Sequence, residues 1–194
     1  NQWSCPGETV RFDGSKSYDS DGSITAYKWS FGDGTSASGV AVSHVYEKPG
    51  IYPVRLNITD NSGSRCNGGV DGLVVFVNDP PIADAGPAIS GCDYVISFNG
   101  EKSYDPDGKI TKYLWYFGDG SAAEGPTPEY IYIQPGDYRV KLIVSDDSES
   151  LCNTASDEIM VSVNAPPVAA AGPDRRVCGG KKVYFEGAAS SDPN

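Results

Sequence analysis

Apolar and polar residues alternate over short stretches along most of the chain. Val54, Leu56 and Ile58 occupy every second position, and the same pattern returns in residues 140–144. A period of two places the apolar side chains on one face of a strand. Clusters of Gly, Pro, Asp and Asn separate these stretches and favour turns, and no stretch has the period of a helix. The pattern therefore predicts an all-β structure.

One stretch occurs twice almost unchanged. Residues 17–34 read SYDSDGSITAYKWSFGDG, and residues 103–120 read SYDPDGKITKYLWYFGDG. Asp-x-Asp-Gly predicts a turn, because its carboxylates can bond nearby backbone amides and its glycine can adopt a positive φ. The alternation of Tyr27, Trp29 and Phe31 predicts a strand after that turn, and Gly-Asp-Gly predicts the reversal that ends it.

The duplication extends over the whole chain with a period of about 86 residues. Trp29 corresponds to Trp115, and Cys66 corresponds to Cys152. We therefore divide the chain into a first repeat that lacks its first strand, a second repeat, and the start of a third, namely residues 1–78, 79–164 and 165–194. Both ends fall partway through a repeat, so we expect the sequence to be a window on a longer protein.

The repeated motifs resemble the PKD (polycystic kidney disease) domain, an immunoglobulin-like β-sandwich with a Trp-x-Phe-Gly-Asp-Gly signature. The chain carries this signature at residues 29–34 and 115–120. A Pro-Gly-x-Tyr motif lies at residues 49–52 and 135–138, and a Pro-Pro linker lies at residues 80–87 and 166–173. The resemblance implies tandem immunoglobulin-like sandwiches arranged as a rod, with each Trp between two sheets. Tyr52 and Tyr138 are either hydroxyl-anchored tyrosine corners or plain core aromatics.

Charge and motif content exclude several classes of function. The chain has 15 Lys and Arg against 26 Asp and Glu, a net charge of −11, and no basic run, which argues against nucleic-acid binding. No stretch approaches the roughly 20 apolar residues that span a bilayer. The single histidine, His44, corresponds to Tyr130 and is interpreted as a strand side chain. No triad can be built and the recurring carboxylates lie in turns, so we expect no enzymatic activity.

The chain has five cysteines and lacks the Cys-x-x-Cys pair that is typical of a zinc site. The cysteines therefore predict disulfides and an extracellular or cell-surface location. Cys5, Cys92 and Cys178 precede the second strand of a repeat, whereas Cys66 and Cys152 precede the last strand. An immunoglobulin-like order places five strand traversals between these two loops, which would leave them at opposite ends of one sandwich. We therefore expect a Cys5–Cys152 bond, with Cys66, Cys92 and Cys178 pairing outside the sequence or in another chain. An altered strand order would instead allow pairs within each repeat, Cys5–Cys66 and Cys92–Cys152.

The resemblance also implies a calcium site at the junction between repeats, as in similar modules of collagenases. Carboxylates and carbonyls are the ligands that Ca²⁺ prefers. The expected ligands are Asn78, Asp79, Asp105 and Asp107, with Asn164, Asp192 and Asn194 at the next junction. The alternative is a turn whose aspartates bond only to backbone.

A glycosylation sequon begins at Asn57, in the sequence Asn-Ile-Thr. Alternation along its strand predicts that Asn57 points outward. A chance occurrence of the sequon is the competing interpretation.

Three functions remain open. The first is a structural or adhesive spacer, whose partners are neighbouring PKD repeats, other copies of the chain, surface polymers or matrix proteins. The second is an accessory module of a secreted hydrolase, which exposed aromatics in a row would support. Tyr116, Tyr130 and Tyr132 are the candidates, and ordinary sheet-face residues are the favoured interpretation of them. The third is a filament subunit completed by strand addition.

Overall fold

The computed structural model describes residues 1–192, which contain strands and no helix. Among these residues there is accordingly no helix of the length and apolarity needed to cross a membrane. The chain divides into two compact units. The first contains residues 1–83, 103–112 and 143–156, and the second contains residues 84–102, 113–142 and 157 onward. The first unit thus combines the first repeat with two loop regions of the second repeat.

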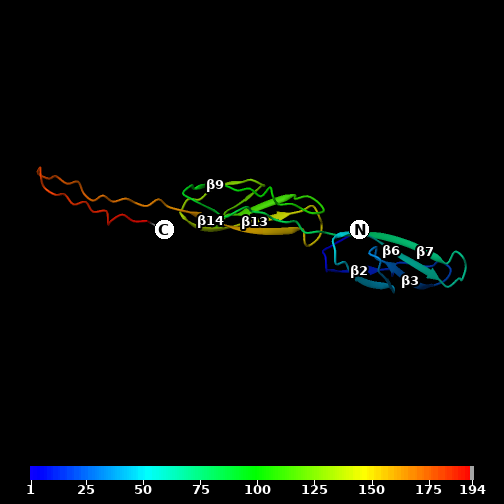
Figure 1. Cartoon of the computed structure of the whole chain (residues 1–194). Coiled ribbons are helices and arrows are strands. Elements are labelled where there is room, and N and C mark those ends of the chain that lie inside the picture. The colour runs from blue at the N-terminus through cyan, green and yellow to red at the C-terminus, as the bar shows by residue number, and fades with distance from the viewer. Residues whose placement is uncertain (193–194) are drawn as a thin grey trace. The chain divides into compact units, whose positions relative to one another are not determined.

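The first repeat is a sandwich of a five-stranded sheet and a two-stranded sheet. The large sheet has the order β1-β7-β6-β3-β4 and the small sheet pairs β2 with β5. Their bounds are β1 Gln2–Ser4, β2 Thr9–Asp13, β3 Ile24–Ser30, β4 Ser36–Ser38, β5 Ala41–Val45, β6 Gly50–Asp60 and β7 Gly68–Val77. Strand β1 runs parallel to β7, and the other pairs are antiparallel. Figure 1 shows β3, β6 and β7 side by side.

The second repeat reproduces this arrangement. Its large sheet has the order β11-β10-β13-β14-β8, and its small sheet pairs β12 with β9. The bounds are β8 Ile89–Gly91, β9 Val95–Ser97, β10 Lys112–Tyr116, β11 Ala122–Glu124, β12 Glu129–Ile131, β13 Gly136–Ser145 and β14 Thr154–Val163. Strand β8 is parallel to β14, as β1 is to β7. The predicted all-β class and the tandem immunoglobulin-like sandwiches are confirmed.

A tryptophan lies at the centre of each sandwich, as expected. Trp29 is 4% exposed, and its ring lies 5.6 Å from that of Phe12 on the opposite sheet. Its indole Nε1 donates to the Gly39 carbonyl at 3.1 Å, so the buried polar atom is satisfied. Trp115, which is fully buried, donates to Gly125 at the same distance.

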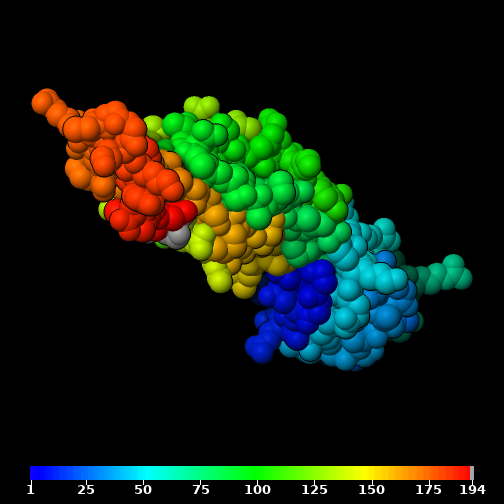
Figure 2. Space-filling view, turned by 60° about the vertical axis from the view of Figure 1, so that its left-hand side comes forward, coloured from blue at the N-terminus to red at the C-terminus, as the bar shows by residue number. Residues whose placement is uncertain are grey.

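The N-terminal strand is held on the rest of the first unit by backbone contacts. The Gly7 amide donates to the Tyr46 carbonyl at 2.9 Å, and the Asn78 amide donates to the Ser4 carbonyl at 3.0 Å. Figure 2 shows the dark blue N-terminal residues packed against cyan residues of the same unit. Strand β1 is therefore an integral edge of its sheet.

The turn glycines have two different roles, one of which the sequence did not predict. Gly32 and Gly34 adopt positive φ values of 85° and 93°, as the reversal requires. Gly22 and Gly108 do not adopt a positive φ, so that expectation was wrong. At Gly108 a Cβ atom would overlap carboxylate oxygens of Asp105 and Asp147. Glycine is needed there for space and not for backbone conformation.

Tyr52 and Tyr138 are tyrosine corners. The Tyr52 hydroxyl donates to the Lys48 carbonyl at 2.9 Å, and the Tyr138 hydroxyl donates to the Gln134 carbonyl at 2.8 Å. Each bond returns four residues along the chain and fixes the entry into strand β6 or β13. Of the two interpretations left open by the sequence, the hydroxyl-anchored one is confirmed.

A buried hydroxyl offers a test of the second sandwich. Tyr132 is 1% exposed and donates to the Phe117 carbonyl at 2.9 Å. We expect Tyr132→Phe to lower the free energy of unfolding by about 1 to 2 kcal/mol, because the buried carbonyl loses its partner. Tyr116→Phe, at an exposed position on the same sandwich, is the matched control and should change it by less than about 0.5 kcal/mol. Equal urea midpoints for the two variants would contradict the assignment.

Candidate functional site

A disulfide connects the first repeat to the second within the first compact unit. Cys5 follows strand β1 and Cys152 precedes strand β14, and their Cα atoms lie 5.9 Å apart in the bond. The structure thus brings together the two cysteines that the strand count pairs. Cys66, Cys92 and Cys178 are exposed thiols in the described part of the chain. The bond spans 147 positions of sequence, including the whole linker.

Hydrogen bonds hold the start of the linker in the same unit. Asn78 is 3% exposed, and its side-chain amide donates to Asp146 Oδ2 at 2.9 Å. The Asp79 amide donates to Asp107 Oδ2 at 3.1 Å. Three of the residues expected to bind calcium therefore take part in the contacts that fix the linker. Their donors and acceptors serve the fold directly.

The Asp-x-Asp-Gly turn of the second repeat carries a carboxylate, Asp105, with an oxygen that has no hydrogen-bond partner. The Asp107 amide donates to Asp105 Oδ1 at 3.4 Å, whereas Asp105 Oδ2 is buried and has no hydrogen-bond partner. Burial raises the pKa of Asp105, the hydrogen bond from Asp107 opposes the increase, and the charges of Asp107 and Asp146 add to it. A cation or a proton at Oδ2 would relieve this repulsion.

The described residues do not present a preformed metal centre. No three His, Cys, Asp or Glu side chains within residues 1–192 are grouped so that they could hold an ion. At the next junction, the Asn164 side-chain amide donates to the Ala165 carbonyl at 3.0 Å, and Asp192 is exposed. Asn194, the last of the expected ligands, lies outside the described residues.

The sequon residue Asn57 is exposed on strand β6. Its neighbours Leu56 and Val54 point into the core, so the outward direction expected from alternation is confirmed. Exposure is compatible with glycosylation, which stays a prediction.

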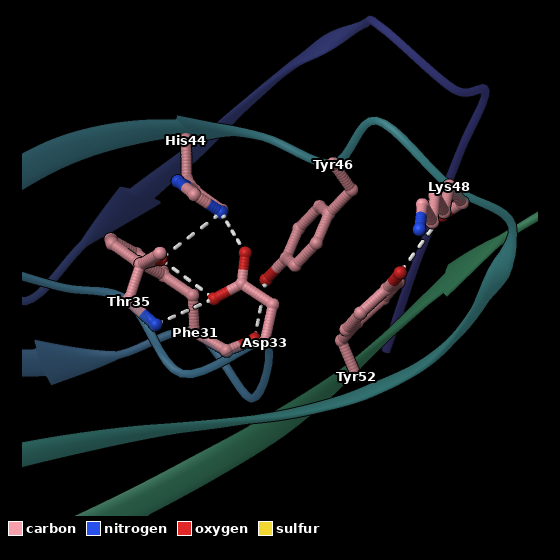
Figure 3. A network of polar contacts seen from close by, with 7 residues as sticks. All are labelled: Phe31, Asp33, Thr35, His44, Tyr46, Lys48 and Tyr52. Carbon is pink, nitrogen blue, oxygen red and sulfur yellow. Dashed lines mark hydrogen bonds and ion pairs between the residues drawn. The ribbon is translucent and has the colours of Figure 1, made fainter.

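The only histidine belongs to a hydrogen-bond network at the Gly-Asp-Gly turn (Figure 3). Asp33 Oδ1 accepts from the Thr35 amide at 2.9 Å and from the Thr35 hydroxyl at 2.6 Å. His44 Nε2 lies 2.6 Å from Asp33 Oδ2, and the imidazole stacks on Phe31 with centroids 4.2 Å apart. The carboxylate is thus held by Thr35 of its own turn and by His44 of strand β5.

This network favours the ionised form of Asp33. Partial burial alone would raise its pKa, but the hydrogen bonds from Thr35 and His44 outweigh burial and lower the pKa to about 2. The associated stabilisation is present at and above the ordinary carboxylate pKa near 4 and is lost as the pH falls through about 2.

Tyr130 occupies the same place in the second repeat. Its hydroxyl donates to Asp119 Oδ2 at 2.6 Å, and its ring stacks on Phe117 with centroids 3.9 Å apart. His44 therefore performs the role of a tyrosine, and the interpretation as a strand side chain agrees with its contacts. Tyr132 is buried and the Tyr130 hydroxyl bonds to Asp119, so Tyr116, Tyr130 and Tyr132 do not form an exposed aromatic row.

Tandem immunoglobulin-like sandwiches with a central Trp and a Gly-Asp-Gly turn define a class of β-sandwich module. The model of the PKD domain matches residues 1–75 and 78–161, and the chain belongs to the PKD domain family. PKD domains are non-catalytic modules.

Relatives with known names carry this module within longer chains. The chain is 34% identical over 208 residues to the dyslexia-associated protein KIAA0319 of Homo sapiens, a match that covers 96% of the chain and 19% of that protein. It is 48% identical over 56 residues to collagenase ColA of Clostridium perfringens, covering 29% of the chain and 5% of the collagenase. The chain therefore spans only a small part of the relatives that it matches.

Solved structures show the same architecture. A three-domain variant fragment of titin, I67–I69, superposes with a TM-score of 0.53 at 14% identity, covering 86% of the chain and 64% of the fragment. At this identity the similarity shows the fold alone.

Exchange of the histidine tests whether its role is structural. We expect His44→Ala to lower the free energy of unfolding by about 1 to 2 kcal/mol, because Asp33 loses a hydrogen-bond donor and Phe31 loses a stacking partner. His44→Tyr should retain most of the stability, since Tyr130 makes the equivalent bond in the second repeat. The difference between wild type and His44→Ala should shrink between about pH 4 and pH 2. Equal losses in the two variants, measured by urea unfolding, would contradict this role.

Proposed function

We propose that the chain is a non-catalytic extracellular spacer whose repeats are connected by disulfides. The observation that carries this proposal is the Cys5–Cys152 bond, which joins the start of the first repeat to the end of the second. A disulfide between repeats has no catalytic role here, and it limits how far the chain can be stretched by force. Extracellular location agrees with the stability of disulfides in oxidising compartments.

The position of the bond determines which residues carry a load. Force applied to the two ends of the chain passes from Cys5 directly to Cys152 and leaves residues 6–151 outside the covalent path. Strands β2 to β13 and the linker then carry no direct load, whereas β1 and β14 remain on the load path. A spacer that connects a cell or an enzyme to a surface benefits from such protection, because most strands of both repeats bear no direct force.

An accessory role in a secreted hydrolase is the second candidate. The similarity to collagenase ColA covers the PKD region and favours this setting. The aromatic residues considered for substrate contact do not form an exposed row, since Tyr132 is buried. A spacer role is compatible with both settings, because a hydrolase also needs its domains held apart.

Calcium at the linker is a secondary proposal. The unsatisfied Asp105 Oδ2 and the nearby Asp107 and Asp146 carboxylates support it, because a cation would offset their mutual repulsion. Main-chain carbonyls and water would supply the ligands that carboxylates do not. Such an ion would reinforce the linker contacts of Asn78 and Asp79.

Single-molecule extension tests the spacer. With force applied at residues 1 and 194, we expect the oxidised chain to lengthen only by the segment after Cys152. Reduction should release a further length of about 500 Å, from the bond's separation of 147 residues and about 3.4 Å for each extended residue. Cys152→Ser should behave as the reduced chain does without reductant, and Cys66→Ser should behave as wild type. Equal extensions of the oxidised and reduced chains would refute the load path.

Thermal unfolding in calcium tests the secondary proposal separately. With a dissociation constant of about 0.1 to 1 mM, 10 mM Ca²⁺ should stabilise the fold by about 1.4 to 2.7 kcal/mol and raise the melting temperature by several degrees. Asp107→Asn should remove the increase. Asp21→Asn, at the equivalent turn position of the first repeat, should leave it unchanged. No shift with Ca²⁺ would reject the site without bearing on the disulfide.

A further inference from the structure

A row of apolar side chains crosses three strands of the large sheet in the first repeat. Trp3 on β1 is the register partner of Phe76 on β7, and Phe76 is also the partner of Ile51 on β6. Directly opposite residues on neighbouring strands share a face, and three strands at a spacing of about 4.8 Å make the row about 10 Å wide. The flanking Val75 and Val77 are buried in the core. The row therefore lies on the outer face of the sheet.

The two ends of this row are accessible to a ligand. Trp3 is 40% exposed and Ile51 is 70% exposed. The indole of Trp3 stacks on Phe76, with ring centroids 4.9 Å apart and an angle of 27° between the ring planes, which fixes its position on the sheet. Single exposed apolar residues are common on protein surfaces, whereas adjoining ones indicate a contact site.

The second repeat shows that the sandwich does not require this row. The corresponding positions on β8, β14 and β13 are occupied by Ser90, Ser162 and Asp137. Ser162 is the register partner of Ser90, and its hydroxyl donates to Asp137 Oδ1 at 2.6 Å. The strand order is nevertheless the same in both repeats. Packing of the fold therefore does not explain why the first repeat carries two aromatic residues and an isoleucine here.

A hollow of about 350 Å³ lies beside the row, and all of its lining residues belong to the first compact unit. Strand β1 runs from a position opposite Val75 to one opposite Val77, and the hollow lies at the Val77 end, where β1 and β7 leave the sheet. Its lining includes the three residues of the row and the carboxylates of Asp79, Asp107 and Asp147. Its volume is in the range of pockets that bind small ligands or single side chains.

The negative charge of the hollow is not neutralised by the chain itself. Asp107 Oδ2 accepts from the Asp79 backbone amide at 3.1 Å, and Asp147 Oδ1 accepts from the Lys109 backbone amide at 3.3 Å. Within residues 1–192, no Lys, Arg or His side chain forms an ion pair with any of the three carboxylates. The hollow thus combines an aromatic wall with uncompensated negative charge.

This combination favours a guanidinium group over other ligands. A guanidinium is planar, stacks on the face of an indole, donates to carboxylates in pairs of hydrogen bonds, and is more weakly hydrated than an ammonium. A neutral sugar could stack on Trp3 but would leave the repulsion among the carboxylates in place. A bare metal ion would reduce that repulsion but would make no use of the aromatic row.

We propose that the hollow binds an arginine side chain presented by a partner protein. The guanidinium stacks on Trp3 and donates to the carboxylates of Asp79 and Asp147, and the methylene groups of the arginine cover Ile51. The net charge of −11 attracts such a partner from a distance. The inference does not depend on the spacer role or on calcium.

An NMR titration of the whole chain with acetyl-Gly-Arg-Gly-amide, in the presence of a calcium chelator, tests the site. Trp29 and Trp115 are buried, so their indole N–H signals are internal references for that of Trp3. We expect only the Trp3 signal to shift, with a dissociation constant of about 1 to 10 mM, because a single side chain supplies most of the contacts. The peptide with neutral citrulline in place of arginine should bind about tenfold more weakly. Equal binding of the citrulline peptide, or no saturable shift at about 50 mM of the arginine peptide, would overturn the proposal.

Substitution of the carboxylates separates this site from a general effect of charge. Asp147→Asn retains the Oδ1 atom that accepts from Lys109 and should weaken binding about threefold, and its combination with Asp79→Asn should weaken binding about tenfold. Asp137→Asn makes the same change of charge on the polar row of the second repeat and should leave the affinity unchanged. Equal losses in Asp137→Asn and Asp147→Asn would assign the binding to net charge and overturn the site.

Two further measurements identify the occupant. Trp3→Ser introduces the residue of the second repeat and should abolish the transfer of NMR saturation from the chain to the arginine of the peptide, with an unchanged fold checked by the signals of Trp29 and Trp115. A shift of the Trp3 signal with neutral cellotetraose but not with the arginine peptide would indicate a sugar site and overturn the proposal. A shift on concentrating the chain alone would place the arginine on a second copy and overturn the choice of a separate partner.

Discussion

The structure depends on the burial of one tryptophan between two sheets in each repeat. Trp115 is fully buried, its indole nitrogen is satisfied by the Gly125 carbonyl, and its ring packs against Phe98 at 5.3 Å. This contact holds the two sheets together, while the order and direction of the strands decide which turns lie at each end of the sandwich.

Much of this arrangement could be predicted from the sequence because the chain contains its own comparison. Two copies of a motif at a constant separation show which residues belong to the fold. Residues that differ between copies, such as His44 and Tyr130, then show which side chains can exchange. The position of each cysteine within the repeat, combined with the number of strand traversals, predicts the pair Cys5 and Cys152.

The sequence could not predict the places where the more polar side chains point into the core and the more apolar ones point outward. In the segment Glu129–Ile131 and the two residues after it, tyrosines alternate with isoleucines. Simple hydrophobicity would bury the isoleucines, yet Ile133 is 86% exposed and Tyr132 is 1% exposed. The tyrosines point inward because their hydroxyls reach the Phe117 carbonyl and the Asp119 carboxylate. A hydrogen-bond partner that lies 11 or 15 positions away in sequence is not visible in a hydrophobic pattern.

The same limit applies to Gly108, whose need for space follows from side chains that approach it from the turn and from a distant loop. Here Asp105 is near Asp147, and both are near the linker. A chain that concentrates carboxylates where it also places its linker must offset their repulsion, and Asn78 does so in part by donating to Asp146. The side-chain amide of Asn78 therefore stabilises the linker against an acidic surface, although it is neutral and no cationic side chain takes part.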